Sequence, residues 1–150
     1  MENFRLLQQY LSETFVKLFG GGKAELRLMD EKDVLGCGIE IVAQPPGKKL
    51  QMLSLLSGGE RALTAIAILF AMLKLKPTPF CILDEIEAAL DDANIGYYAD
   101  YLKEYSKGRQ FIVVTHRKGT MERCNSLFGV AMEEQGVSRM VSVSLQDYQE

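Results

Sequence analysis

Three titratable side chains follow two short apolar runs, at the point where each run ends. The run FCIL (80–83) leads into Asp84 and Glu85, and the run FIVV (111–114) ends shortly before His116. If both runs are strands of an open α/β sheet, these side chains gather at its carboxyl edge, where such sheets bind ligands. Because neighbouring strand residues point to opposite faces, one acidic residue can hold a metal while the other moves a proton. The alternative is that the acidic pair opens a solvated loop and that the histidine is structural.

A second candidate site lies where Ser57 and Glu60 enclose two glycines. A serine followed three residues later by a glutamate is a capping box, which begins a helix. The box leaves Gly58 and Gly59 unexplained, since each costs up to about 1 kcal/mol relative to alanine in a helix interior. Glycines leave the backbone N–H groups bare, and with the helix dipole they form a site that a phosphate can approach. A phosphate ligand accounts for both glycines.

A phosphate site, a carboxylate for Mg²⁺ and a candidate base suggest nucleotide hydrolysis, which commonly uses a P-loop. The one Gly-Lys pair in a glycine-rich run is Gly22-Lys23, and the pattern GxxxxGK[ST] would need glycine at Lys17 and serine or threonine at Ala24. Neither position matches the pattern. The sequence therefore contains half of a nucleotide site.

The first fifty residues predict a helix and a hairpin. Residues 2–19 carry apolar side chains at helical spacing, and three glycines then stop the helix. This helix either packs on its own domain or begins a longer coiled coil. Residues 24–30 and 36–44 alternate apolar and polar residues around a polar turn at 31–33, which predicts a hairpin. The basic loop at 45–49 is typical of a solvated segment.

From residue 55 onward the pattern is α/β. The expected elements are helices at 58–76, 93–106 and near 119–124, and strands at 80–83, 111–114, 127–133 and 137–145. The two short apolar runs lack alternation, so we expect strands buried on both faces of a parallel sheet covered by helices. The fold class is α/β, with a mostly parallel centre and antiparallel margins.

Composition excludes several classes of protein. The 150 residues are 47% hydrophobic and 25% charged, as in an ordinary globular domain, and the net charge of −3 argues against an autonomous nucleic-acid binder. Cys37, Cys81 and Cys124 are odd in number and widely spaced, which indicates neither a disulfide framework nor a zinc site. A reducing, cytoplasmic setting follows. No signal peptide is recognised, and the apolar run 62–73 is too short to cross a membrane.

Three long segments, in order, resemble the C-terminal lobe of the ATPase head of a bacterial SMC (structural maintenance of chromosomes) protein, a member of the ABC-type ATPase superfamily. They are LLSGGERALTAIAILFA (55–71), FCILDEIEAALDDAN (80–94) and FIVVTHRKGTME (111–122). FGGGKAEL (19–26) resembles the stretch where the coiled-coil neck enters the head. The resemblance implies a neck or coiled-coil stump helix at 1–19 and a C-terminal head lobe at 20–150. One departure is Glu87, where many members have Asp, which keeps the charge.

The resemblance also implies a role for each candidate residue. In the family, the ABC signature contacts the γ-phosphate of ATP on the opposite head, and the D-loop crosses the dimer contact. The Walker B aspartate acts on Mg²⁺ through water, and the following glutamate activates the attacking water. The switch histidine lies near the γ-phosphate. The matching residues are Ser57, Gly58, Gly59 and Glu60 (signature), Asp84 (Walker B), Glu85 (glutamate base), Leu90-Asp91 (D-loop) and His116 (switch).

The family resemblance explains the absent P-loop, because in SMC proteins the Walker A motif lies in an N-terminal lobe across the coiled coil and hinge. We therefore expect half of an ATPase head, inactive alone, that serves ATP-driven head engagement in chromosome condensation and segregation. The implied cofactors are ATP and Mg²⁺ in the complete head. The implied partners are the N-terminal lobe, a second SMC head, the C-terminal winged-helix domain of a ScpA-type kleisin, and DNA. The implied location is cytoplasmic and nucleoid-associated, with no membrane contact.

The sequence is also compatible with two other functions. The chain is either a docking module for the kleisin, with catalytic residues idle, or the head lobe of a related DNA-repair ABC ATPase. The docking surface would lie at 125–145, although its apolar residues are equally suited to face the core. They are Leu127, Phe128, Val130, Met132, Met140 and Val143. Candidates for DNA contact are Lys48, Lys49, Arg117 and Lys118, which are equally suited to solvent or helix ends.

Overall fold

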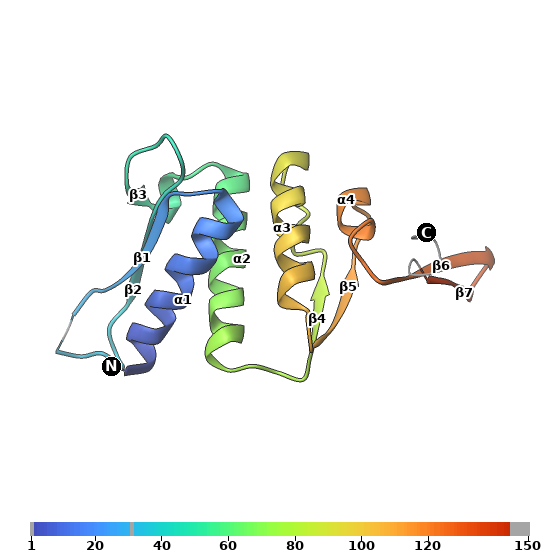
Figure 1. The fold of residues 1–150 in the computed structure, drawn as a ribbon, viewed down its shortest axis with the longest axis horizontal. Helices are drawn as coiled ribbons and strands as arrows, with labels where there is room; N and C mark the ends of the chain where they lie inside the picture. The colour runs from blue at the N-terminus through green and yellow to red at the C-terminus, as the bar shows by residue number, and fades with distance from the viewer. Residues whose placement is uncertain (1, 31, 145–150) are drawn as a thin grey trace.

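The computed structural model describes residues 2–30 and 32–144 (Figure 1). The expected helices and strands are all present, with ends shifted by at most three residues. Among the described residues no helix is long and apolar enough to cross a membrane. In chain order the elements are α1 (Glu2–Phe19), β1 (Lys23–Leu28), β2 (Ile39–Gln44), β3 (Gln51–Met52), the 3₁₀ turn η1 (Leu53–Leu55), α2 (Gly58–Leu75), β4 (Phe80–Asp84), α3 (Asp92–Tyr105), β5 (Gln110–Val114), α4 (Lys118–Met121), β6 (Ser126–Glu134) and β7 (Val137–Ser144).

Helix α1 leads directly into an antiparallel sheet of order β1-β2-β3. The helix ends at three glycines with positive φ, and a Cβ on Gly22 would collide with the carbonyl oxygen of Gln44. Glycine at this position therefore lets the chain turn closely against β2. Strand β1 pairs with β2 as predicted, with Leu26 opposite Ile41. The predicted turn includes residue 31, which lies outside the described residues.

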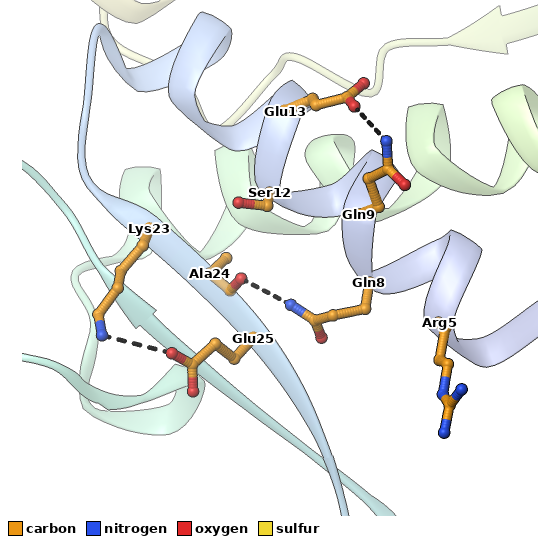
Figure 2. A pocket seen from close by; sticks show the side chains of 8 residues that line it. All are labelled: Arg5, Gln8, Gln9, Ser12, Glu13, Lys23, Ala24 and Glu25. Atoms are coloured by element: carbon orange, nitrogen blue, oxygen red, sulfur yellow. Dashed lines mark hydrogen bonds and ion pairs between the residues drawn. The ribbon is translucent and has the colours of Figure 1, made fainter. Parts of the chain in front are cut away.

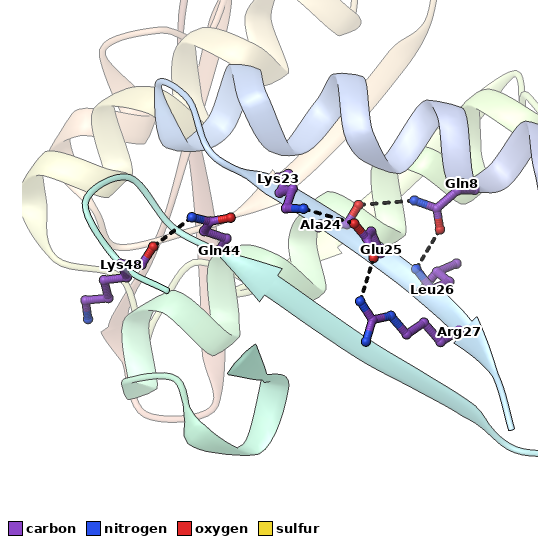
Figure 3. A network of polar contacts seen from close by, with 8 residues as sticks. All are labelled: Gln8, Lys23, Ala24, Glu25, Leu26, Arg27, Gln44 and Lys48. Carbon is purple, nitrogen blue, oxygen red and sulfur yellow. Dashed lines mark hydrogen bonds and ion pairs between the residues drawn. The ribbon is translucent and has the colours of Figure 1, made fainter. Parts of the chain in front are cut away.

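A polar clamp joins α1 to β1, the edge strand of this sheet. Gln8 Nε2 donates to the carbonyl oxygen of Ala24 at 3.1 Å, and Gln8 Oε1 accepts from the backbone N–H of Leu26 at 2.6 Å (Figure 3). A single side chain thus satisfies two backbone groups that an edge strand leaves open. Figure 2 shows the polar groove that remains between α1 and β1, lined by Arg5, Gln8, Gln9, Ser12, Glu13, Lys23, Ala24 and Glu25.

The hydrophobic core lies among the three long helices. Helix α1 packs against α2, α3 and β1, so it is part of the domain whether or not it also continues into a coiled coil. The ring of Phe70 contacts the rings of Tyr101 and Tyr105 edge to face, with centroids 5.0 and 5.4 Å apart. Fully buried side chains from the helices include Leu11, Phe15, Leu18, Leu63, Phe70 and Tyr98.

Strands β4 and β5 form a parallel pair connected through α3, with Ile82 opposite Ile112. The predicted parallel pairing is confirmed, but the prediction that both faces are buried is wrong. One face packs toward the helices, and there Leu83 is 3% exposed. On the other face Ile82 is 59% and Ile112 is 47% exposed, because no described element covers it. Phe80 and Val114 belong to the same open face.

The chain ends in the antiparallel hairpin of β6 and β7, which extends away from the helices (Figure 1). Val130 lies opposite Met140, and each is 72% exposed. Phe128 and Met132 are also exposed, whereas Leu127 is half-buried. The alternative that these apolar residues face the core is therefore wrong for Phe128, Val130, Met132 and Met140. The side chain of Val143 lies outside the described residues.

Candidate functional site

The candidate residues lie at one end of the molecule. Figure 1 shows that α2 and α3 begin, and β4 and β5 end, toward the same side. The fold therefore brings Asp84, Glu85 and His116 to one edge, as the sequence predicts, and it also places the Ser57 segment on that side. Two helix N-termini at this edge supply positive electrostatic potential for an anion.

The predicted capping box at the start of α2 is confirmed. Ser57 Oγ accepts from the backbone N–H of Glu60 at 3.4 Å, and Glu60 Oε2 accepts from the backbone N–H of Ser57 at 3.1 Å. Lys48 adds an ion pair, with Nζ 2.8 Å from Glu60 Oε1. The hydrogen bond from Lys48, assisted by those from Ser57, lowers the pKa of Glu60 below its ordinary value of 4.5, against the effect of burial. A charged Glu60 therefore stabilises the start of this helix.

The two glycines inside the box are not required by packing. A Cβ on Gly58 would meet no described atom within 4 Å, and one on Gly59 would lie 3.6 Å from the carbonyl oxygen of Ala89, an ordinary contact. The described chain therefore has room for a side chain at both positions, so its own packing does not account for the glycines. That an anion is held by the bare backbone N–H groups stays a prediction.

Glu85 and His116 are in contact. His116 Nδ1 lies 3.1 Å from Glu85 Oε1, and the two side chains are 63% and 51% exposed. Glu85 has φ of 47°, the one positive φ at a non-glycine residue among those described. Its backbone N–H donates to the carbonyl oxygen of Val114 at 2.9 Å, which holds the strained residue in place. Such backbone strain costs about 1–3 kcal/mol and is common at functional sites.

Asp84 ends β4 and is exposed to solvent. No group of three or more His, Cys, Asp or Glu that could hold a metal occurs in the part of the chain that the structure describes. Mg²⁺ commonly binds through one or two carboxylates together with water and nucleotide phosphates. A lone exposed carboxylate therefore fits Mg²⁺ if a nucleotide supplies oxygen ligands as well.

Asp91 caps the start of α3, a structural role that the sequence analysis did not predict. It is the N-cap of α3, and its Oδ1 accepts from the backbone N–H of Asn94 at 2.9 Å. Capping of this kind contributes about 1 kcal/mol to helix stability.

Sequence reasoning missed a buried network behind the Glu85–His116 pair. Glu87 is 1% exposed, and its Oε1 accepts from Thr115 Oγ1 at 2.5 Å and from Thr120 Oγ1 at 3.1 Å. Arg117 donates to the carbonyl oxygen of Leu90. This contact favours a structural role for Arg117 over the predicted DNA contact. The family resemblance singles out Glu87 only as a position where many members have Asp, and no local pattern indicates that its side chain is buried.

Two hollows of the described surface lie away from the candidate residues. One is the α1–β1 groove, and the other is lined by Ile39, Glu40, Ile41, Met52, Leu53, Ser54 and Arg61. Neither contains a predicted site residue. Asp84, Glu85 and His116 are all exposed, so the candidate site lies open on the surface.

Comparison with known proteins gives consistent matches over nearly the whole chain. The family described as RecF/RecN/SMC N terminal domain matches residues 7–139. The Chromosome partition protein Smc of Bacillus subtilis (strain 168) is 60% identical over 149 residues, which is 99% of this chain and 13% of that protein. The chain thus spans about an eighth of the length of the curated Smc relatives it matches.

Two solved structures share the fold. One, from work on ATP-driven dimerization and DNA-stimulated activation of SMC ATPases, superimposes with a TM-score of 0.88 at 45% identity, covering 99% of this chain and 89% of that one. The other is an Smc head domain with an extended coiled coil from Pyrococcus furiosus, bound to the C-terminal domain of ScpA. It has a TM-score of 0.86 at 46% identity and covers 97% of this chain and 36% of that one.

Proposed function

The chain belongs to the RecF/RecN/SMC family and has the fold of an SMC ATPase head, and from this premise we propose that it is the C-terminal head lobe. The matching family is described as an N-terminal domain. A lobe on the Walker A side would carry GxxxxGK[ST], and this sequence has no match to that pattern. The lobe proposed here supplies the signature motif, the Walker B aspartate and the switch histidine. Residues 1–19 form the neck helix, and residues 20–150 form the lobe.

The observation that carries this proposal is the Glu85–His116 contact on strained backbone, directly after Asp84. Phosphoryl transfer requires alignment of water, metal and phosphate more than covalent chemistry by the protein. Glu85 accepts a proton from the attacking water, and His116 holds the Glu85 carboxylate and faces the γ-phosphate. Asp84 would hold Mg²⁺ through its water shell, and this ion would neutralise charge on the phosphates.

The open face of the β4–β5 pair supports the proposal that this lobe is incomplete alone. Parallel strands are usually buried on both faces, yet Phe80, Ile82, Ile112 and Val114 are exposed here. We propose that the Walker A lobe covers this face. If so, the two lobes co-purify when produced together, and a failure to associate would contradict the assignment.

The bare glycines at the start of α2 support a second partner. A Cβ on Gly58 would meet no described atom within 4 Å, which leaves room for a ligand, and we propose that this ligand is the phosphate of ATP held by another head. A relative of known structure was studied for ATP-driven dimerization of SMC ATPases. In a reconstituted head, Ser57→Arg should block ATP-dependent pairing, measured by analytical ultracentrifugation. An unchanged balance of monomer and dimer would contradict the signature assignment.

The role in the cell follows from the relatives. Likeness to chromosome partition proteins favours chromosome condensation and segregation over a DNA-repair head. We place the complete protein on the nucleoid in the cytoplasm, where it contacts DNA. Lys48 forms an ion pair of 2.8 Å with Glu60, and Lys118 forms a longer one of 3.7 Å with Glu122, so among the sequence-derived DNA candidates Lys49 is the better one.

The exposed hairpin supports an additional function, kleisin docking. Phe128, Val130, Met132 and Met140 lie on one face of β6–β7 and are all exposed, and a relative binds the C-terminal domain of ScpA. We expect Met140→Asp to abolish capture of a kleisin winged-helix domain in a pull-down. Ala131→Asp, on the opposite face, is the matched control. Equal capture by both variants would contradict this surface.

A further inference from the structure

A single buried carboxylate oxygen holds both ends of the segment that carries His116. Thr115 directly follows β5 and Thr120 lies within α4, on either side of the histidine. Both hydroxyls donate to Oε1 of Glu87, at 2.5 and 3.1 Å. Glu87 itself lies two residues after Glu85. The residue therefore links the two chain segments whose side chains meet in the Glu85–His116 pair.

The same two segments are tied at a second point. The guanidinium of Arg117 donates to the carbonyl oxygen of Leu90, the residue before Asp91. The backbone N–H of Arg117 also donates to Thr115 Oγ1 at 3.0 Å. Thr115 thus donates to Glu87 while it accepts from Arg117. The segment 115–120 is fixed to the segment 85–91 by a continuous hydrogen-bonded network.

Stability alone does not explain an acidic residue in this position. A buried carboxylate is costly to desolvate, and Glu87 Oε2 has no hydrogen-bond partner among the described residues. Replacement of buried ionic groups by apolar residues of similar size is often neutral or stabilising. What Glu87 supplies, and an apolar residue does not, is one acceptor shared by two hydroxyls.

We propose that Glu87 is a positioning residue that holds His116 in reach of Glu85. Its effect on ATP hydrolysis rests on the proposed function, whereas its effect on the His116 loop is a property of this chain alone. Glu87→Ala removes the acceptor and frees both threonines. Glu87→Gln keeps an oxygen that accepts from both hydroxyls while it removes the negative charge, so it should preserve the loop.

The first test measures the order of the His116 ring. His116 is the only histidine in the chain, so its imidazole carbons give unique NMR signals. In the 150-residue chain we expect Glu87→Ala to cause a loss of ring order in ¹³C relaxation and Glu87→Gln to retain the wild-type order. Thr14→Val is the matched control, since Thr14 is a buried threonine bonded to Tyr101 Oη at 3.2 Å, in another region.

Thr120→Val keeps the proposal testable if Glu87→Ala fails to fold. It removes one of the two hydroxyl donors and conserves side-chain volume. We expect reduced order of the His116 ring in Thr120→Val and unchanged order in Thr14→Val. Wild-type order in Thr120→Val would overturn the proposal, as would an equal loss in both threonine variants, which would indicate general destabilisation.

The second test uses the head reconstituted with a Walker A lobe. Because misplacement of a reacting group lowers the rate of the chemical step, Thr120→Val should reduce kcat for ATP about 10-fold and leave KM unchanged. A raised KM for ATP with unchanged kcat would overturn the proposal. If the wild-type head hydrolyses no ATP, the proposed function fails, and the His116 ring measurement still decides the role of Glu87.

Discussion

The helical core and the β4–β5 pair differ in how completely they bury their apolar side chains. Phe15 and Phe70 of the core are fully buried, whereas Ile82 of β4 is 59% exposed. Apolar surface of this kind costs roughly 25 cal/mol per Å² while it stays in water. The helical core is therefore covered within the described residues, whereas one face of the β4–β5 pair is open to solvent. The candidate catalytic residues lie at the edge of this open pair of strands.

The largest expected effect tests whether that edge performs the chemistry. In the reconstituted head, Glu85→Gln removes the proposed base, and ATP turnover should fall about 10²- to 10⁴-fold while ATP-dependent pairing is retained. Turnover is measured by phosphate release and pairing by ultracentrifugation. Glu133→Gln makes the same chemical change on the exposed hairpin and should leave turnover unchanged. Full ATP turnover in Glu85→Gln would show that Glu85 is not the base and that this edge does not perform the chemistry.

The second prediction concerns the stability of the chain by itself. Phe70→Ala opens a cavity among the helices and should lower the free energy of unfolding by about 3–5 kcal/mol. Ile82→Ala removes an exposed side chain and should change it by less than about 0.5 kcal/mol. Chemical denaturation of the two variants measures both values. Similar losses would show that the open sheet face is buried in solution.

The third prediction concerns association with the proposed Walker A lobe. Ile82→Lys places a charge on the open face, and it should weaken binding of a Walker A lobe about 10- to 100-fold, as for a central interface residue. Ile39→Lys is the control, because Ile39 is 51% exposed on β2, in the β1-β2-β3 sheet. Calorimetric titration gives the two affinities. Equal weakening by both variants would mean that the open face is not the contact.

The smallest expected effect concerns the start of α2. Ser57→Ala should lower the free energy of unfolding by about 1 kcal/mol, the usual value of an N-cap. Glu60 has a lowered pKa in the folded chain, so its charged form stabilises the fold above its ordinary pKa of 4.5. That contribution should disappear as the pH falls through the lowered pKa. Lys48→Met should reduce this pH dependence in denaturation curves, and an unchanged curve would contradict the ion pair.

Much of the fold was predictable because local signals agree with tertiary structure. The apolar stripe of α1, the glycines that end it and the capping box at Ser57 each depend on neighbours within a few residues. The meeting of Glu85 and His116 was also predictable, because parallel strands bring their carboxyl ends to one edge. Sequence patterns are sufficient where the determining contacts are local or follow from topology.

The exposed sheet face was not predictable by the same route. An apolar run such as FCIL (80–83) indicates that both faces are suited to burial, but it carries no information on what covers them. Under the proposed function the covering element belongs to another lobe. The sequence pattern therefore describes the complete head, whereas the structure shows one chain of it.

The buried network was missed for a different reason. Glu87 is one of several acidic residues in its segment, and its burial depends on threonines about thirty residues away. The positive φ of Glu85 likewise depends on a backbone contact with β5. Neither feature has a local pattern, because each arises when the two strands and their following segments are placed side by side.

The most direct test of the central claim is ATP turnover by this chain with and without a Walker A lobe. The 150-residue chain alone should release no phosphate above background, and the co-purified pair of lobes should hydrolyse ATP. Glu85→Gln in the same pair is the baseline for contaminating activity. Steady ATP hydrolysis by the wild-type chain alone, absent in Glu85→Gln, would contradict the account of an active site completed by other lobes.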